Sequence, residues 1–147
     1  METGNLLIDA QTAFARQRRR RRLDRVGAWL RRSPQTGRLA ALEDAMGAAP
    51  PSNRRRAGLH AIPLESIVGT AEPAKARVFD SRFRAPESSR RRWEHLWMAS
   101  RKGAALPPIS VFRLGEHHFV DDGHHRVSVA QALGMVAIDA EVVDLNT

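Results

Sequence analysis

Residues 119–133 read FVDDGHHRVSVAQAL, an order that predicts a strand, a glycine turn and a helix. The apolar strand ends at Asp121 and Asp122, and Gly123 follows directly. A glycine lets the backbone turn and lets a ligand approach without meeting a Cβ atom. The helix that begins after it collects unpaired N–H groups and the positive end of the helix dipole, which favour anions.

The first turn of this predicted helix carries His124, His125 and Arg126. A guanidinium offers a planar fork of donors that suits a phosphate, and the imidazoles add further hydrogen-bonding groups. Gly123 and these three residues therefore form a candidate phosphate site. The alternative is a plain strand–turn–helix junction, since Asp-Gly is a common turn dipeptide. The crowding of His-His-Arg favours a ligand, because a solvated helix start more often carries Ser, Thr, Asp or Glu.

The composition bounds the class of protein. At 147 residues, the chain has room for one modest domain, or for a small domain with a helical appendage. It has no cysteine, which excludes disulfides, thiolate metal sites and cysteine nucleophiles. The sequence has neither a run of about 20 apolar residues nor the order of a signal peptide. We therefore expect a cytoplasmic protein with no membrane partner.

The chain carries a net charge of +8, and nearly all of its basic residues are arginine. A basic surface attracts nucleic acid through counterion release. Coding bias in a GC-rich genome would also replace lysine with arginine, but it does not explain the excess of positive charge or its clustering. The charge therefore favours contact with a polyanion, although it does not predict recognition of bases.

Residues 5–32 are predicted to form one long helix that ends before Pro34. Its arginine tract comprises Arg18, Arg19, Arg20, Arg21 and Arg22. Arginines in such a run point all round a helix, and like charges at i and i+4 repel. An acidic partner, nucleic acid or membrane headgroups along one side would relieve that repulsion. The alternative is a solvated helix whose arginines extend from its edges. We also consider a homodimer formed through this helix.

Residues 48–53 are typical of a linker, so we predict an arginine-rich helical extension over 1–53 and a globular domain over 54–147. Within the domain we expect an α+β fold with a small mixed sheet. Predicted strands cover 59–64, 109–114, 117–121 and 137–143, and a helix covers 86–102 with Trp93 and Trp97 in the core. The segment 69–86 is either a binding loop or a loop held to the core by Phe79 and Phe83.

From residue 62 onward, the order of elements resembles the ParB N-terminal and sulfiredoxin-like superfamily. The matching segments are IPLESI at 62–67, LPPISV at 106–111, FVDDGHHR at 119–126 and the closing strand after Gly134. The resemblance implies the α+β fold and a phosphate cradle at Gly123. It also implies that Arg82 or Arg84 reaches into this site from the facing loop.

The three branches of the superfamily differ at the motif. ParB-like proteins carry Gly-Glu-Arg-Arg-x-Arg against the phosphates of CTP; here Gly123 and Arg126 match, His125 stands at the first arginine, and the glutamate and last arginine are replaced. Sulfiredoxins carry Gly-Cys-His-Arg; here a histidine stands in place of the catalytic cysteine, so sulfinic acid reduction is not predicted. A free-serine kinase carries an Asp-Gly-His-x-Arg motif, which Asp122 to Arg126 resemble.

The resemblance implies a ParB-like regulator that binds a nucleotide, DNA or both, with CTP or ATP and Mg²⁺ as the expected ligands. The alternative is a small phosphotransferase of the free-serine-kinase type, in which Asp122 or Asp121 would hold Mg²⁺ and Glu65 or Asp80 would act as the base. A nuclease is a third possibility. His117 and His118 are neighbours on a strand and cannot face one ion, so no other metal site is expected. Whether the chain is an enzyme stays open.

Overall fold

The computed structural model describes residues 4–31, 38–47 and 53–146. Their elements are α1 (Leu6–Arg31), β1 (Ala40–Ala41), α2 (Leu42–Met46), β2 (Asn53–Pro63), η1 (Leu64–Ser66), β3 (Ile67–Thr70), α3 (Pro73–Ala76), η2 (Glu87–Ser89), α4 (Arg90–Arg101), β4 (Ile109–Leu114), β5 (His117–Asp122), α5 (His124–Ala132) and β6 (Ala137–Asn146). The predicted combination of helices with one mixed sheet is confirmed.

The sheet has six strands in the order β1-β3-β5-β4-β6-β2. β5 pairs in parallel with β3 and antiparallel with β4, so it lies inside the sheet. β4 pairs in parallel with β6, whose other neighbour is the antiparallel edge strand β2. Because β5 leads directly into Gly123 and α5, the sheet places the glycine turn at the end of a strand that is hydrogen-bonded on both sides.

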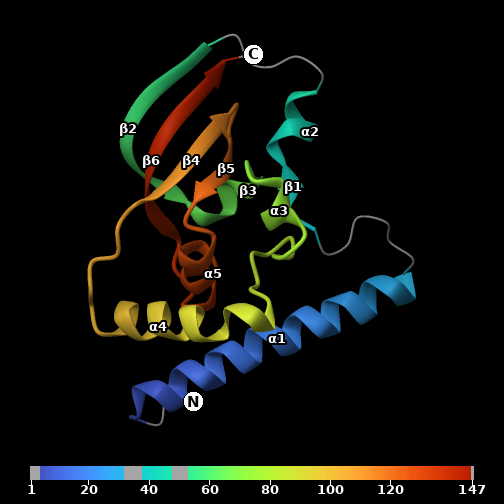
Figure 1. Cartoon of the computed structure of the whole chain (residues 1–147), viewed down its shortest axis with the longest axis vertical. Helices are drawn as coiled ribbons and strands as arrows, with labels where there is room; N and C mark the ends of the chain where they lie inside the picture. Colours follow the sequence, from blue (N-terminus) through green and yellow to red (C-terminus); the bar gives the residue numbers. More distant parts are fainter. Residues whose placement is uncertain (1–3, 32–37, 48–52, 147) are drawn as a thin grey trace.

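Three helices lie below the sheet in succession: α5, α4 and α1 (Figure 1). The rings of Phe14 on α1 and Trp93 on α4 meet edge to face, with 5.4 Å between their centroids. Both side chains are fully buried, as is Ala10, and they belong to the same core cluster as the inner residues of the sheet. The long N-terminal helix therefore contributes to the core of the fold.

The boundary predicted at residue 53 does not separate two packing units. α1 shares the core described above, and β1, which also precedes this boundary, pairs with β3. The arginines at 54–56 lie in β2, which is longer than the strand predicted over 59–64. The linker predicted at 48–53 falls largely outside the described residues.

Three short elements were not predicted, and the shortest of them, β1, has only two residues. β3 and α3 are each four residues long, too short for a hydrophobic period to show in the sequence. By contrast, β4 was predicted with its observed bounds, and Trp93, Trp97, Phe79 and Phe83 are all buried as expected. None of the helices in the described ranges combines the length and apolarity needed to cross a lipid bilayer.

Candidate anion-binding site

Gly123 precedes the first residue of α5 with φ +111°, a conformation that side-chain-bearing residues rarely adopt. A Cβ atom at this position would lie 2.4 Å from Cγ2 of Ile109 on β4. The backbone can therefore pack against β4 only because this residue is glycine. The N–H of Val127 donates to the carbonyl oxygen of Gly123 at 3.0 Å, which leaves the preceding N–H groups of the helix without intrahelical acceptors.

His124 is buried, with 3% of its surface exposed. Its Nε2 lies 2.7 Å from Oγ1 of Thr70 on β3, and its ring packs against those of Phe79 and Phe83, with centroids 5.7 and 6.3 Å away. Burial, with a smaller contribution from the charge of Lys75, lowers the pKa of His124 to about 4. The ring is therefore neutral at pH 7 and ties α5 to β3.

His125 has a similar environment on the other side of the helix start. Its Nε2 lies 2.8 Å from Oγ of Ser89, just before α4, and its ring meets that of Phe79 edge to face at 5.1 Å. Burial and then the charges of Arg92 and Lys75 lower its pKa to about 4. Both histidines therefore supply hydrogen bonds and packing at neutral pH, and the positive charge of the site comes from other side chains.

Arg126 is tied to the chain entering β4. Its Nη1 donates to the carbonyl oxygens of Pro107 and Pro108 at 2.7 and 2.8 Å, and its Nη2 donates to Oδ2 of Asp122 at 3.2 Å. These contacts hold the guanidinium beside the first turn of α5. Only some of its donors are left for a ligand, so further cations would be needed to hold a phosphate strongly.

A pocket of about 250 Å³ opens at this helix start. Its lining comprises Glu72, Lys75, Arg92, Leu96, Asp122, Gly123, His124, His125 and Arg126. We call it the anion pocket. Lys75 comes from α3 and Arg92 from α4; within the described part of the chain neither forms an ion pair or a side-chain hydrogen bond. Two cations from separate elements, neither of them in an ion pair within the described residues, therefore line the same small pocket, which also holds the carboxylates of Glu72 and Asp122.

The sequence contains only a partial signal for these two cations. The arginines at 90–92 stand at the start of α4, where they oppose the helix dipole, and that placement suggested that they face a ligand or an acid. Arg92 lines the pocket, whereas Arg91 does not. Lys75 was not predicted, because it belongs to the short helix that the sequence did not reveal.

Asp80 and Arg84 are not in the anion pocket. The Oδ1 of Asp80 accepts the backbone N–H groups of Arg82 and Arg84 at 3.0 and 2.8 Å, and its Oδ2 accepts Nε of Arg84 at 2.7 Å. Arg84 also donates to Asp24 on α1. These groups organise the loop itself, which corrects the expectation that Asp80 acts as a base and that Arg84 reaches the ligand.

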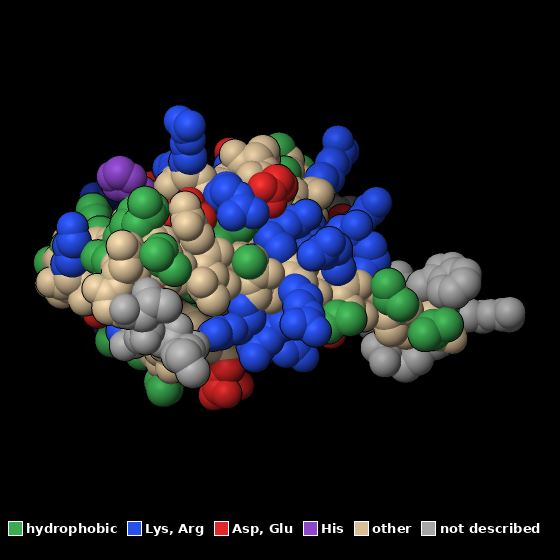
Figure 2. Space-filling model, turned by 90° about the horizontal axis from the view of Figure 1, so that it is seen from below, with side chains coloured by type: hydrophobic (Ala, Val, Ile, Leu, Met, Phe, Trp, Pro, Cys, Tyr) green, Lys and Arg blue, Asp and Glu red, His purple; other side chains and the backbone are tan. Residues whose placement is uncertain are grey.

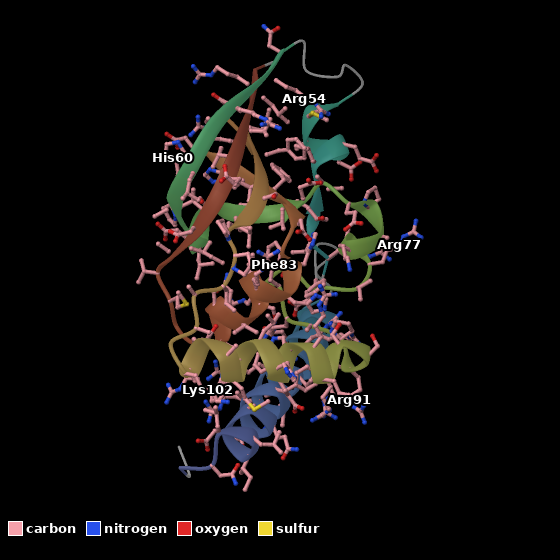
Figure 3. The ribbon with its side chains drawn as sticks, turned by 60° about the vertical axis from the view of Figure 1, so that its left-hand side comes forward. Arg54, His60, Arg77, Phe83, Arg91 and Lys102 are labelled. Atoms are coloured by element: carbon pink, nitrogen blue, oxygen red, sulfur yellow. The ribbon has the colours of Figure 1, made fainter. Side chains whose placement is uncertain are left out.

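Glu65 and Arg82 are exposed, and neither is among the residues that line the pocket. Of the residues predicted for the phosphate site, the fold brings together Asp122, Gly123, His124, His125 and Arg126, and it leaves Arg82, Arg84, Glu65 and Asp80 outside. Figure 3 shows Phe83 from that loop beside α5, so the loop contributes rings rather than arginines to the site.

The arginine tract of α1 divides into two groups. Arg21 donates from Nη2 to Val78 O at 2.9 Å and from Nη1 to Arg84 O at 3.1 Å, and Arg18 donates to Ala85 O at 3.4 Å. Burial lowers the pKa of Arg21. The exposed group comprises Arg19, Arg20 and Arg22. Figure 2 shows Lys and Arg side chains gathered over the face seen from below, the side on which α1 lies.

Metal-ligating side chains do not gather in groups of three or more His, Asp or Glu within the described ranges. On β5, His117 is exposed and His118 is buried, with Nδ1 of His118 2.8 Å from Oγ of Ser66. The two imidazoles therefore face opposite sides of the sheet. The acidic groups that line the anion pocket are the carboxylates of Asp122 and Glu72.

No protein-family model matches the chain, and no curated protein matches it. Among solved structures, the chain is similar to the sulfiredoxin from Arabidopsis thaliana. The two are 23% identical over 57% of this chain and 82% of that chain, with a TM-score of 0.42.

Proposed function

We propose that the chain binds a phosphate-bearing ligand, a nucleotide such as CTP or ATP, in the anion pocket. The observation that carries this proposal is the convergence of Lys75 and Arg92, both unpaired within the described residues, on the N-terminus of α5. A helix start supplies N–H donors, and Lys75 and Arg92 supply positive charge that exceeds the single charge of Glu72, since Asp122 accepts a hydrogen bond from Arg126. A phosphate satisfies both.

The residues around the phosphate would have distinct roles. Lys75 and Arg92 would supply charge, and the N–H groups that follow Gly123 would donate to phosphate oxygens. Arg126 would add its remaining donors while holding the chain that enters β4. Carboxylate oxygens suit Mg²⁺, so Asp122 and Glu72 would hold the ion beside the phosphate. The charge of the ion would then reduce the repulsion between the phosphate and these two carboxylates.

The test is a thermal-shift and calorimetric titration with CTP, ATP, ADP and GTP, with and without Mg²⁺, on the wild type, Lys75→Ala and Arg92→Ala. A ligand at ~100 times its Kd adds about 2.7 kcal/mol to the free energy of unfolding, enough to raise Tm by several degrees. We expect each substitution to weaken binding at least about tenfold, since hydrogen bonds to charged groups contribute about 1.5–3 kcal/mol.

Arg91→Ala is the matched control, because Arg91 neighbours Arg92 on α4, is exposed and does not line the anion pocket (Figure 3). This variant should bind as the wild type does. The proposal fails if none of the four nucleotides binds, or if Arg91→Ala weakens binding as much as Arg92→Ala.

A phosphotransferase on the same site has weaker support. The bases considered for it, Glu65 and Asp80, lie outside the pocket. Both carboxylate oxygens of Asp80 already accept hydrogen bonds from residues of its own loop. Asp122 and Glu72 are the carboxylates that line the pocket, so a transfer reaction would have to use one of them. Turnover of ATP with free serine as the acceptor, compared between wild type and Glu72→Gln, tests this alternative.

Contact with a nucleic acid is a second candidate function, and the exposed arginines of α1 favour it. Arg19, Arg20 and Arg22 lie on the solvent side of α1, whereas Arg18 and Arg21 are used within the fold. Phosphate contacts by such arginines position a duplex without reading its bases. We therefore assign any such contact to the exposed group alone, and binding of duplex DNA as a function of salt tests it.

A further inference from the structure

The solvent side of α1 carries three large apolar side chains that the fold does not bury. Leu23, Val26 and Leu30 are 59%, 55% and 69% exposed. In Figure 1 the C-terminal part of α1 runs on past the beginning of α4, and Figure 2 shows hydrophobic side chains there beside the gathered Lys and Arg. We call these three residues the apolar stripe. Neither the anion pocket nor arginine–phosphate contacts with DNA make use of them.

The apolar stripe has the spacing of a coiled-coil seam. Its residues stand at i, i+3 and i+7, so a heptad that begins at residue 16 places them at positions a, d and a. At 3.6 residues per turn they span only about 60° of the helix circumference. A helix that buries against a broad apolar surface carries a stripe of about 100° or more. The narrow stripe therefore fits the side of one other helix.

The same heptad separates the residues that hold α1 to the fold from those that face solvent. Gln17, Arg18 and Arg21 occupy positions b, c and f, and all three donate hydrogen bonds to the loop over 78–85. Asp24, at the next b position, accepts a hydrogen bond from the same loop. By contrast, the a and d positions from residue 16 to residue 30 are all exposed. They form a continuous ridge on the outer side of α1.

Arginines continue and flank the apolar stripe on this ridge. Arg16 and Arg19, at positions a and d, extend the seam toward the N-terminus. Arg20 and Arg22 stand at positions e and g, where charges select the partner of a coiled coil. Asp24 is the single acidic residue of this stretch, and it is paired within the fold. We infer that this ridge docks a helix of another protein, one whose apolar stripe is flanked by aspartate or glutamate.

Charge decides between this partner and a second copy of the chain. In a parallel pair of α1 helices, Arg16 and Arg19 would each meet the same residue of the other copy within the seam, where like charges repel. An antiparallel pair would set these arginines against the other copy's apolar stripe. DNA would meet the arginines, but its charged phosphates would bury none of the apolar stripe. An acidic amphipathic helix satisfies both halves of the ridge, and this docking does not depend on the anion pocket.

The test uses the full chain and two synthetic peptides of defined chemistry. The first is an 18-residue helical peptide with leucine at positions a and d and glutamate at e and g. The second has lysine in place of each glutamate. Fluorescence anisotropy at constant salt measures the two affinities. We expect the glutamate peptide to bind and the lysine peptide to bind at least about tenfold more weakly, because the charges at e and g set the choice of partner.

Leu23→Gln/Val26→Gln/Leu30→Gln removes the apolar stripe and leaves the core intact, because all three side chains are exposed. This variant should bind the glutamate peptide at least about tenfold more weakly, since the apolar burial at the seam is lost. Circular dichroism should show the helix content of the wild type. Binding that survives the three substitutions would overturn the inference.

The matched control is Leu59→Gln/Met135→Gln/Val136→Gln, which removes three exposed apolar side chains from other parts of the surface. It should bind the glutamate peptide as the wild type does. Arg20→Glu/Arg22→Glu reverses the flanking charges, so this variant should lose the glutamate peptide and bind the lysine peptide instead. A general loss of folding could not produce that exchange.

The remaining outcomes identify the wrong occupants. If neither peptide binds the wild type, or if the two triple variants lose the glutamate peptide equally, the ridge is not a helix-docking surface. If sedimentation shows a dimer that the substitutions in the apolar stripe convert to a monomer, a second copy occupies the ridge. If those substitutions weaken binding of duplex DNA instead, DNA lies on the stripe. Each of these three results overturns the inference.

Discussion

Nη2 of Arg21 on α1 lies 2.9 Å from the carbonyl oxygen of Val78, in the loop that packs against the anion pocket. The residue that follows, Phe79, is buried against the rings of His124 and His125. The N-terminal helix is thereby connected to the first turn of α5 through one loop. Part of the arginine tract therefore supports the site from within the fold.

Arg21→Ala should lower the free energy of unfolding by about 1–3 kcal/mol, because it leaves two partly buried carbonyl oxygens without their charged donor. Urea unfolding followed by circular dichroism measures this. Arg20→Ala is the control from the same tract: its side chain is exposed, so the change should stay within about 0.5 kcal/mol. Equal effects of the two substitutions would contradict the division of the tract.

Gly123→Ala tests the glycine turn. The backbone conformation at φ +111° would cost about 1–3 kcal/mol with a side chain, and the contact with Cγ2 of the buried Ile109 adds about 1–3 kcal/mol of overpacking. We therefore expect a loss of about 2–6 kcal/mol in the free energy of unfolding, and weaker nucleotide binding in any variant that folds.

Gly134→Ala is the matched control at the other end of α5. It also has a positive φ, +71°, but a methyl group at this position would have no atom of the described residues within 4 Å. Only the conformational cost of about 1–2 kcal/mol applies there. If Gly123→Ala is no more damaging than Gly134→Ala, the close approach to β4 does not require glycine.

The glycine turn was visible in the sequence because strand, Asp-Gly and helix follow one another without interruption. The positive charge of the anion pocket could not be predicted from the sequence, because it depends on which side chains the fold brings to that turn. Lys75 lies on a helix of four residues, and Arg92 is distinguished from Arg91 only by its place on α4. In the same way, the run of arginines on α1 has no pattern that separates Arg21 from Arg20. Only the folded structure separates them, because Arg21 donates to carbonyl oxygens of the loop at Val78 and Arg84, whereas Arg20 is exposed.

The two histidines of the motif should make the fold sensitive to acid. Their pKa values are lowered to about 4, so between pH 6.5 and 4 the unfolded chain binds more protons than the folded chain. The free energy of unfolding is therefore at its full value above pH 6.5 and falls as the pH decreases through this window. At about 1.36 kcal/mol per pKa unit, each histidine contributes up to about 3 kcal/mol of this loss.

His125→Gln should remove its own share of this dependence. Urea unfolding of wild type and variant at intervals from pH 7.5 to 4.5 gives the difference in the free energy of unfolding at each pH. Carboxylates titrate in both proteins and cancel in that difference. We expect the difference to be constant above pH 7 and to shrink as the pH falls. A difference that is the same at every pH would show that His125 is not held neutral by the fold.

The exposed arginines of α1 make a last prediction, on the salt dependence of DNA binding. Each arginine–phosphate contact on duplex DNA contributes about 0.9 to the slope of log K against log salt, so Arg19→Ala/Arg20→Ala/Arg22→Ala together should reduce its magnitude by about 2.7. Fluorescence anisotropy with a labelled duplex at several salt concentrations measures the slope.

Arg54→Ala/Arg55→Ala/Arg56→Ala is the control, because it removes the same formal charge from the edge strand β2. There Arg54 lies over the ring of Phe112, and Arg55 is 3.7 Å from Asp144. If net charge alone attracts DNA, the two triple variants will lower affinity and slope equally. If α1 is the contact surface, the slope will fall only when its exposed arginines are removed, since counterions are released only where phosphates meet the protein.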